Sequence, residues 1–115
     1  MAANEMFVSA LRTTGDLAGV FEFDGVAGYF YLYETKGAEG RKVVAAIQVV
    51  TGSPDFRQED VTIRWDASER IVGLFVRQRL WAAFDGDARV KYGGNYRADT
   101  QPLIPAEIVH VFESR

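Results

Sequence analysis

The sequence contains no cysteine and only one histidine among its 115 residues. The lack of thiols excludes disulfide bonds, thiolate metal sites and a cysteine nucleophile. His110 has no second histidine for a metal site and no evident partners for a catalytic triad. Because it stands between Val109 and Val111, we expect it to have a structural role. The sequence therefore predicts no catalytic residues, no metal site and no cofactor.

Long apolar runs and a basic surplus are also missing. No stretch approaches the ~20 apolar residues needed to cross a bilayer, and residues 1–12 lack the basic and apolar regions of a signal peptide. Lys and Arg number 13 against 16 Asp and Glu, for a net charge of -3. Phosphate binding needs a basic patch or surplus, so this balance disfavours nucleic acid as a partner. We expect a cytoplasmic protein with neither a membrane nor a nucleic-acid partner.

What the chain does have is enough apolar residues, 48% of the total, to form one β domain over residues 1–115 with a core of its own. Residues 61–85 organise it. Residues 61–65 alternate apolar and polar, as in a strand with one buried face. Residues 71–76 are apolar almost throughout, which is typical of a strand covered on both faces. Residues 80–84 complete three consecutive antiparallel strands.

A hairpin is predicted over residues 17–23 and 28–34. Asp24-Gly25 between them tolerates the positive φ values of short hairpin turns. In the returning strand Phe30 and Leu32 share one face, and the opposite face carries three tyrosines: Tyr29, Tyr31 and Tyr33.

The remaining segments are shorter or more ambiguous. Residues 42–50 favour an interior strand, because valine and isoleucine fill both faces. Residues 4–12 fit a short helix or an edge strand, and we favour the strand. Residues 88–92 suggest a short strand, and 108–112 a last strand, although Pro105 could instead open a short helix. We predict an all-β fold of six to eight antiparallel strands: a meander-rich sandwich or partly open barrel with at most one short helix.

Several acidic residues could act as acid-base pairs or as cation ligands. Glu22, Asp24 and Glu34 surround one hairpin and could approach as an acid-base pair, but a turn aspartate and two solvated glutamates explain them better. Asp85-Gly86-Asp87 has the spacing of cation ligands but no glutamate that completes a calcium loop, so a hairpin turn is favoured. Residues 92–96 are glycine-rich without the ending of a phosphate loop, which favours a plain connection.

The aromatic residues with polar groups are the candidate binding residues: Tyr29, Tyr31, Tyr33, Trp65 and Trp81. Tyrosine and tryptophan are enriched at interface hot spots, but the same residues also fit a sandwich core whose hydroxyls reach the surface. The leading hypothesis is a non-enzymatic interaction module that binds a protein partner or a second copy through the tyrosine face or an exposed edge strand. The alternative is a small-ligand binding domain or hydrolase, whose pocket combines both tryptophans with the tyrosines beside Asp24 or Asp85.

Two stretches resemble a known family. Residues 19–34, GVFEFDGVAGYFYLYE, combine an acidic-glycine turn with an aromatic strand. Residues 61–85 join a strand ending in Trp65 to an aliphatic strand and to a strand closing in Ala83-Phe84-Asp85. Together they are similar to the small bacterial proteins grouped as domain of unknown function 2251. This resemblance covers about 40 residues of strand and turn patterns and implies no particular activity.

Overall fold

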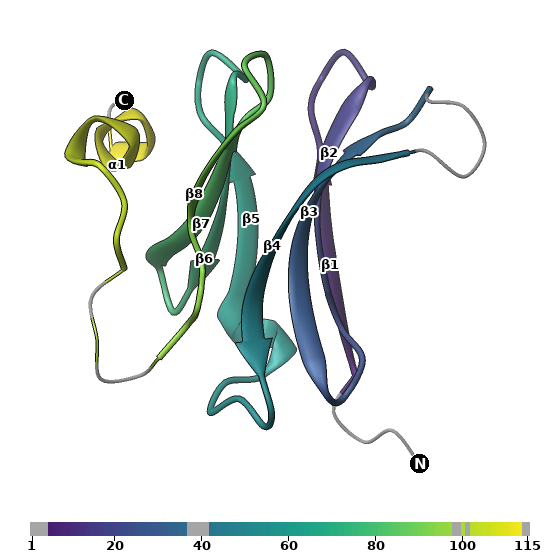
Figure 1. Ribbon diagram of the computed structural model, residues 1–115. Coiled ribbons are helices and arrows are strands. Elements are labelled where there is room, and N and C mark those ends of the chain that lie inside the picture. The colour runs from purple at the N-terminus through teal and green to yellow at the C-terminus, as the bar shows by residue number, and fades with distance from the viewer. Residues whose placement is uncertain (1–4, 37–41, 98–99, 101, 114–115) are drawn as a thin grey trace.

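The computed structural model describes residues 5–36, 42–97, 100 and 102–113. They form eight strands, one 3-10 turn and one α-helix: β1 (Met6–Leu11), β2 (Leu17–Phe23), β3 (Ala27–Glu34), β4 (Val43–Thr51), η1 (Gln58–Asp60), β5 (Val61–Trp65), β6 (Ile71–Val76), β7 (Arg79–Asp85), β8 (Val90–Gly93) and α1 (Ala106–Glu113). The strands form two four-stranded antiparallel sheets, which we call sheet A (β1-β2-β3-β4) and sheet B (β5-β6-β7-β8). Figure 1 shows three layers: α1, then sheet B, then sheet A. The predicted all-β sandwich with one short helix is confirmed.

Both sheets are meanders, in which neighbours in sequence are neighbours in space. The chain completes sheet A before it begins sheet B, and it crosses between them once, through the segment that contains η1. Antiparallel strands need only short turns between them. The alternating pattern of each segment therefore leads directly to its place in a sheet.

The predicted hairpin is present as β2 and β3, with Val20 opposite Tyr31 and Phe21 opposite Phe30. The turn forms because the Asp24 carboxylate accepts hydrogen bonds from the backbone N–H groups of Val26 and Ala27, both at 2.9 Å. Asp24 is thus the turn residue that the sequence predicted.

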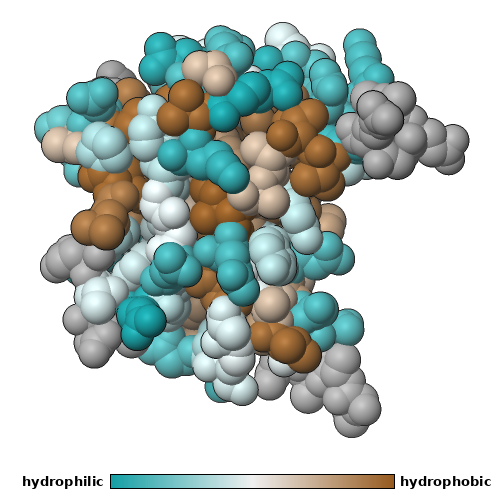
Figure 2. All heavy atoms as spheres, in the orientation of Figure 1, coloured by the Kyte–Doolittle hydropathy of each residue, from teal (hydrophilic) through white to brown (hydrophobic). Residues whose placement is uncertain are grey.

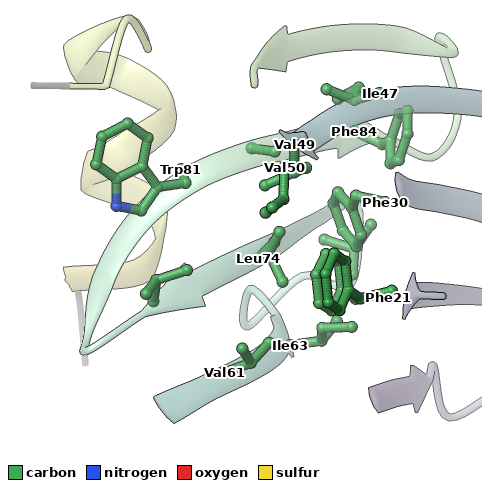
Figure 3. Close-up of a cluster of buried hydrophobic side chains, with 14 of the residues drawn as sticks. Phe21, Phe30, Ile47, Val49, Val50, Val61, Ile63, Leu74, Trp81 and Phe84 are labelled. Atoms are coloured by element: carbon green, nitrogen blue, oxygen red, sulfur yellow. The ribbon is translucent and has the colours of Figure 1, made fainter. Parts of the chain in front are cut away.

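The main core lies between the inner faces of the two sheets. Figure 3 shows Phe21 and Phe30 of sheet A meeting Leu74 and Phe84 of sheet B, and the Phe30 and Phe84 rings lie 5.0 Å apart between centroids. Gly19 permits this close approach, because a Cβ there would lie 2.7 Å from a methyl carbon of Val72. Packing at this density leaves no room for even one added methyl group without movement.

A second, smaller core lies on the outer face of sheet B, beneath α1. Its buried members are Ile71, Phe75, Leu80, Ala83 and Ile108. Every residue of β6 is buried, because alternate side chains enter the main core and this second core. The prediction that residues 71–76 are covered on both faces is confirmed.

The strand predicted over residues 108–112 is wrong, since these residues lie in α1, whose first hydrogen bonds are accepted by the Pro105 carbonyl. Ile108 and Phe112, four residues apart, share the helix face that packs on sheet B. The interior strand predicted over 42–50 forms as β4 but lies at an edge of sheet A. Residues 4–12 contain strand β1, as favoured.

Candidate interaction surface

The predicted tyrosine face is the outer face of sheet A, on the side away from sheet B. Tyr29, Tyr31 and Tyr33 alternate with the buried Phe30 and Leu32, and each is half-buried. The rings of Tyr29 and Tyr31 stack with centroids 6.0 Å apart and an interplanar angle of 15°. Each of the three tyrosines is therefore partly accessible to solvent.

Large apolar side chains of the flanking strands extend this face. Phe7 and Leu11 of β1 are each 58% exposed, and Val43 of β4 is 49% exposed. Together with Tyr31 and Tyr33 they border a hollow of about 560 Å³, the sheet A hollow. It is lined by Phe7, Ser9, Leu11, Ala18, Val20, Glu22, Tyr31, Tyr33, Thr35 and Val43. Figure 2, with sheet A at the right, shows hydrophobic residues gathered on that side of the molecule among hydrophilic ones.

Among the described residues that line the sheet A hollow, the charge is of one sign. Glu22 is the charged member of the lining, and it lies opposite Tyr29 in the register of β2 and β3. Burial raises the pKa of Tyr31 above its ordinary value of 10.0, and the nearby charges of Glu22 and Asp24 contribute to the same shift. The surface is therefore apolar and aromatic, with hydroxyl groups and an acidic border.

The edges of sheet A are less accessible than its outer face. On the β1 side, the backbone N–H of Phe7 donates to the Gln58 side chain at 2.9 Å, and the Trp65 indole donates to the Ala10 carbonyl at 3.0 Å. On the β4 side, the backbone N–H of Tyr96 donates to the Val49 carbonyl at 2.7 Å. Segments from the second half of the chain thus occupy backbone groups on both edges.

Trp65 lies at one end of the sandwich, away from the sheet A hollow. It is half-buried, and the Arg12 guanidinium lies 5.4 Å from the centre of its ring. The hydrogen bond from its indole N–H to the Ala10 carbonyl links β5 to β1. The residue therefore has a structural role in joining the two sheets.

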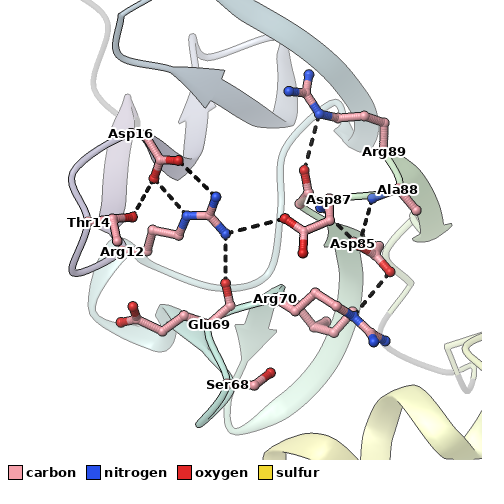
Figure 4. Close-up of polar contacts among 12 residues, drawn as sticks. Arg12, Thr14, Asp16, Ser68, Glu69, Arg70, Asp85, Asp87, Ala88 and Arg89 are labelled. Carbon is pink, nitrogen blue, oxygen red and sulfur yellow. Dashed lines mark hydrogen bonds and ion pairs between the residues drawn. The ribbon is translucent and has the colours of Figure 1, made fainter.

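Arg12 is the centre of this junction (Figure 4). Its guanidinium bonds both carboxylate oxygens of Asp16, at 2.8 and 2.9 Å, and the Glu69 carbonyl at 2.9 Å. Asp87 lies 3.8 Å away from it. The hydrogen bond from Arg12 holds the pKa of the Asp16 carboxyl well below its usual range, and a second from Thr14 adds to this. One side chain thus ties the β1–β2 turn to two turns of sheet B.

Trp81 lies on β7 and faces the main core, where it is 3% exposed. Its ring meets Tyr96 edge-on at 4.7 Å, next to the irregularity in the β6–β7 pairing. The prediction that both tryptophans and the tyrosines line one pocket is therefore wrong. The tyrosines line the outside of sheet A, whereas the tryptophans belong to sheet B and point to its inner side or its end.

The acidic residues considered for chemistry have local partners. The Asp85 carboxylate accepts hydrogen bonds from the backbone N–H groups of Asp87 and Ala88, at 3.0 and 2.9 Å, and lies 3.3 Å from Arg70. It forms a hairpin turn, as favoured. Within the described ranges, no three His, Cys, Asp or Glu residues are grouped so that they could hold a metal ion. The predicted alternation around His110 is replaced by helix, and its side chain is 75% exposed beside Glu113.

Sequence reasoning missed the contribution of β1 and β4 to the surface. Phe7 and Leu11 alternate outward on β1 just as the tyrosines do on β3. The same alternation places Met6, Val8 and Ala10 on the inner face of β1. Nothing in the chain's local pattern indicates that these strands flank the tyrosines on one sheet.

The sequence profile of one family, described as "Uncharacterized protein conserved in bacteria (DUF2251)", matches residues 1–102. The chain belongs to the DUF2251 family. The resemblance seen in residues 19–34 and 61–85 is thereby confirmed, and the DUF2251 match spans both sheets and ends before α1. No curated protein and no solved structure matches the chain. Neither described helix has the length and apolar character to cross a membrane.

Proposed function

We propose that this DUF2251 chain is a non-enzymatic interaction module of the bacterial cytoplasm that binds a protein through the outer face of sheet A. The observation that carries the proposal is the gathering of exposed Phe7, Leu11 and Val43 around the half-buried tyrosines. Scattered surface apolar residues are normal, but a contiguous patch bordered by polar groups marks an interaction site.

The composition of this face supports a protein partner. Tyrosine offers a large, rigid contact area together with a hydroxyl, and it is enriched among residues whose truncation weakens protein complexes. The net charge of -3 and the acidic Glu22 are unfavourable for a nucleic-acid backbone. The contacts on both edges of sheet A favour binding on the face over addition of a strand at an edge.

Site-specific photo-crosslinking in bacterial cells tests the proposal. A photoreactive residue replaces Ser9, which lines the sheet A hollow, or Thr62, an exposed residue of β5 that serves as the control. We expect a discrete adduct from position 9 that the added substitution Tyr31→Ala weakens, and none from position 62. An adduct of twice the chain mass would identify a second copy, to be verified by light scattering on the wild type and on Tyr31→Ala. Equal labelling at both positions, or none at either, would contradict the proposal.

A small apolar ligand is the second candidate, favoured by one observation. The sheet A hollow, at about 560 Å³, lies within the range of roughly 300–1,000 Å³ that is typical of ligand pockets. A thermal-shift screen of small aromatic compounds tests this candidate. A compound that raises the melting temperature of the wild type but not of Val20→Glu would support it.

A further inference from the structure

We infer that the outer face of sheet A receives an amphipathic helix of a partner protein, with a lysine or arginine of that helix beside Glu22. This inference rests on the proposed function and names the class of partner. It follows from three features of the described residues: the way the chain covers its other sheet, the shape of the sheet A hollow, and the charge at its border.

The molecule already contains one sheet face covered by an amphipathic helix. On sheet B, α1 buries Ile108 against the outer face, and Phe112 meets Phe75 edge-on with ring centroids 5.2 Å apart. The helix lies close, since a Cβ at Gly73 would be 2.9 Å from the Phe112 ring. Sheet A presents a comparable outer face, but no described segment lies over it (Figure 1).

Shape favours a convex occupant. The sheet A hollow is open and shallowly concave, with Phe7 and Leu11 on one flank and Val43 on the other. A helix is a cylinder about 10 Å wide with its side chains, so one apolar stripe can fill such a trough. The same face of a second copy is also concave, and two concave faces placed together would leave a void that costs contact energy.

The acidic border of the sheet A hollow favours a cationic side chain on that helix. Glu22 is exposed at the border of the hollow, Asp24 follows it in the turn, and no lysine or arginine is among the described residues that line the hollow. Glu22 lies directly across from Tyr29, whose ring stacks on Tyr31. Cross-strand neighbours are about 5 Å apart, so one guanidinium could pair with the carboxylate and lie over the tyrosine rings. The covered sheet shows the same kind of contact, with Arg64 4.6 Å from the Phe75 ring centre.

Labelled synthetic peptides and fluorescence anisotropy provide the test. The probe is an 18-residue amphipathic peptide with a leucine stripe flanked by lysines, and its counterpart carries glutamate at every lysine position. We expect the cationic peptide to bind the wild-type protein at least about fivefold more tightly than the anionic one, because close opposite charges favour one partner over another. The preference should reverse with Glu22→Lys.

Two controls distinguish this contact from non-specific hydrophobic binding and from an effect of the protein's net charge. Glu113→Lys makes the same charge change on α1, on the opposite side of the sandwich, and should preserve the preference of the wild type. A cationic peptide of identical composition with its leucines at alternate positions, a strand pattern, should bind at least about fivefold more weakly than the helical one.

The possible outcomes distinguish a failure of the basic helix from a failure of the proposed function. Equal binding of both charged peptides, or the same loss with Glu113→Lys as with Glu22→Lys, would overturn the basic helix. If position 9 still crosslinks to a protein in cells, the proposed function survives and only the class of partner is wrong. A dimer in solution that Tyr31→Ala breaks would assign the face to a second copy and also overturn this inference.

Discussion

The outer faces of the two sheets differ in what covers them. Phe75 on sheet B is 7% exposed under α1, whereas Phe7 on sheet A is 58% exposed. Both faces present aromatic and aliphatic side chains on regular antiparallel strands. Among the described residues, α1 covers the outer face of sheet B and no segment covers that of sheet A, so sheet B serves as a reference for a covered face.

The same residue pattern can therefore serve stability on one face and recognition on another. Burial removes apolar area from water at about 25 cal/mol per Å². For sheet B this gain comes with folding, and for sheet A we propose that most of it comes with binding. Substitutions on the two faces should therefore have different effects.

The largest difference is expected between Phe75→Ala and Phe7→Ala. Truncating a buried phenylalanine removes its burial and leaves a cavity, so Phe75→Ala should lower the free energy of unfolding by about 3 kcal/mol. Phe7→Ala should lower it by less than about 1 kcal/mol, because its ring is largely in water already. Urea unfolding of both variants measures this. Similar losses would show that the outer face of sheet A is covered as well as that of sheet B.

A smaller effect is expected from Gly73→Ala, which tests how closely α1 covers sheet B. The new methyl group would lie 2.6 Å from a Leu80 methyl carbon and 2.9 Å from the Phe112 ring. Overpacking of this kind costs about 1–3 kcal/mol. Hydrogen exchange should quicken in residues 106–113 more than in β2 and β3, and Phe112→Leu should partly restore stability. Unchanged exchange in α1 would mean that this contact does not hold the helix.

The smallest effect is expected at the junction between the sheets, and it depends on pH. Because its folded pKa is lowered, Asp16 contributes stability above its unfolded pKa, and that contribution is lost as the pH falls through the folded value. The wild type should therefore exceed Asp16→Asn in urea midpoint at about pH 6, and the gap should narrow toward about pH 2. A gap independent of pH would show that the Arg12 contact does not act through the carboxylate charge.

The sequence predicted much of the fold because each strand of a meander carries its own signal. Alternation and turn residues such as Asp24 and Asp85 predict the hairpin of residues 17–34 and the strands of residues 61–85. In the structure, the carboxylates of both aspartates accept backbone hydrogen bonds in their turns. The C-terminal segment was misjudged because Ile108, His110 and Phe112 alternate as in a strand. The stronger signal was Pro105 followed by an apolar pair four residues apart.

The candidate site was only partly predictable. Alternation places Tyr29, Tyr31 and Tyr33 on one face, and the structure confirms that shared face. Period-2 patterning does not reveal which strands stack, so it could not assign Trp65 and Trp81 to the other sheet. Nor could it show which outer face α1 covers, since that depends on packing between segments distant in sequence.

The single crossing between the sheets has a consequence for how the chain can be divided. Gly52 and Ser53 are exposed, and they follow the fourth strand and precede the other four. A cut there leaves every strand pairing of each sheet inside one fragment, and the fragments are then held together by the shared core, the junction around Arg12 and Trp65, and the contacts at the edges of sheet A. The two halves therefore meet the requirements of a split protein, in which separately expressed fragments reassemble through one large apolar interface. Reassembly of such fragments reports the association of the proteins fused to them.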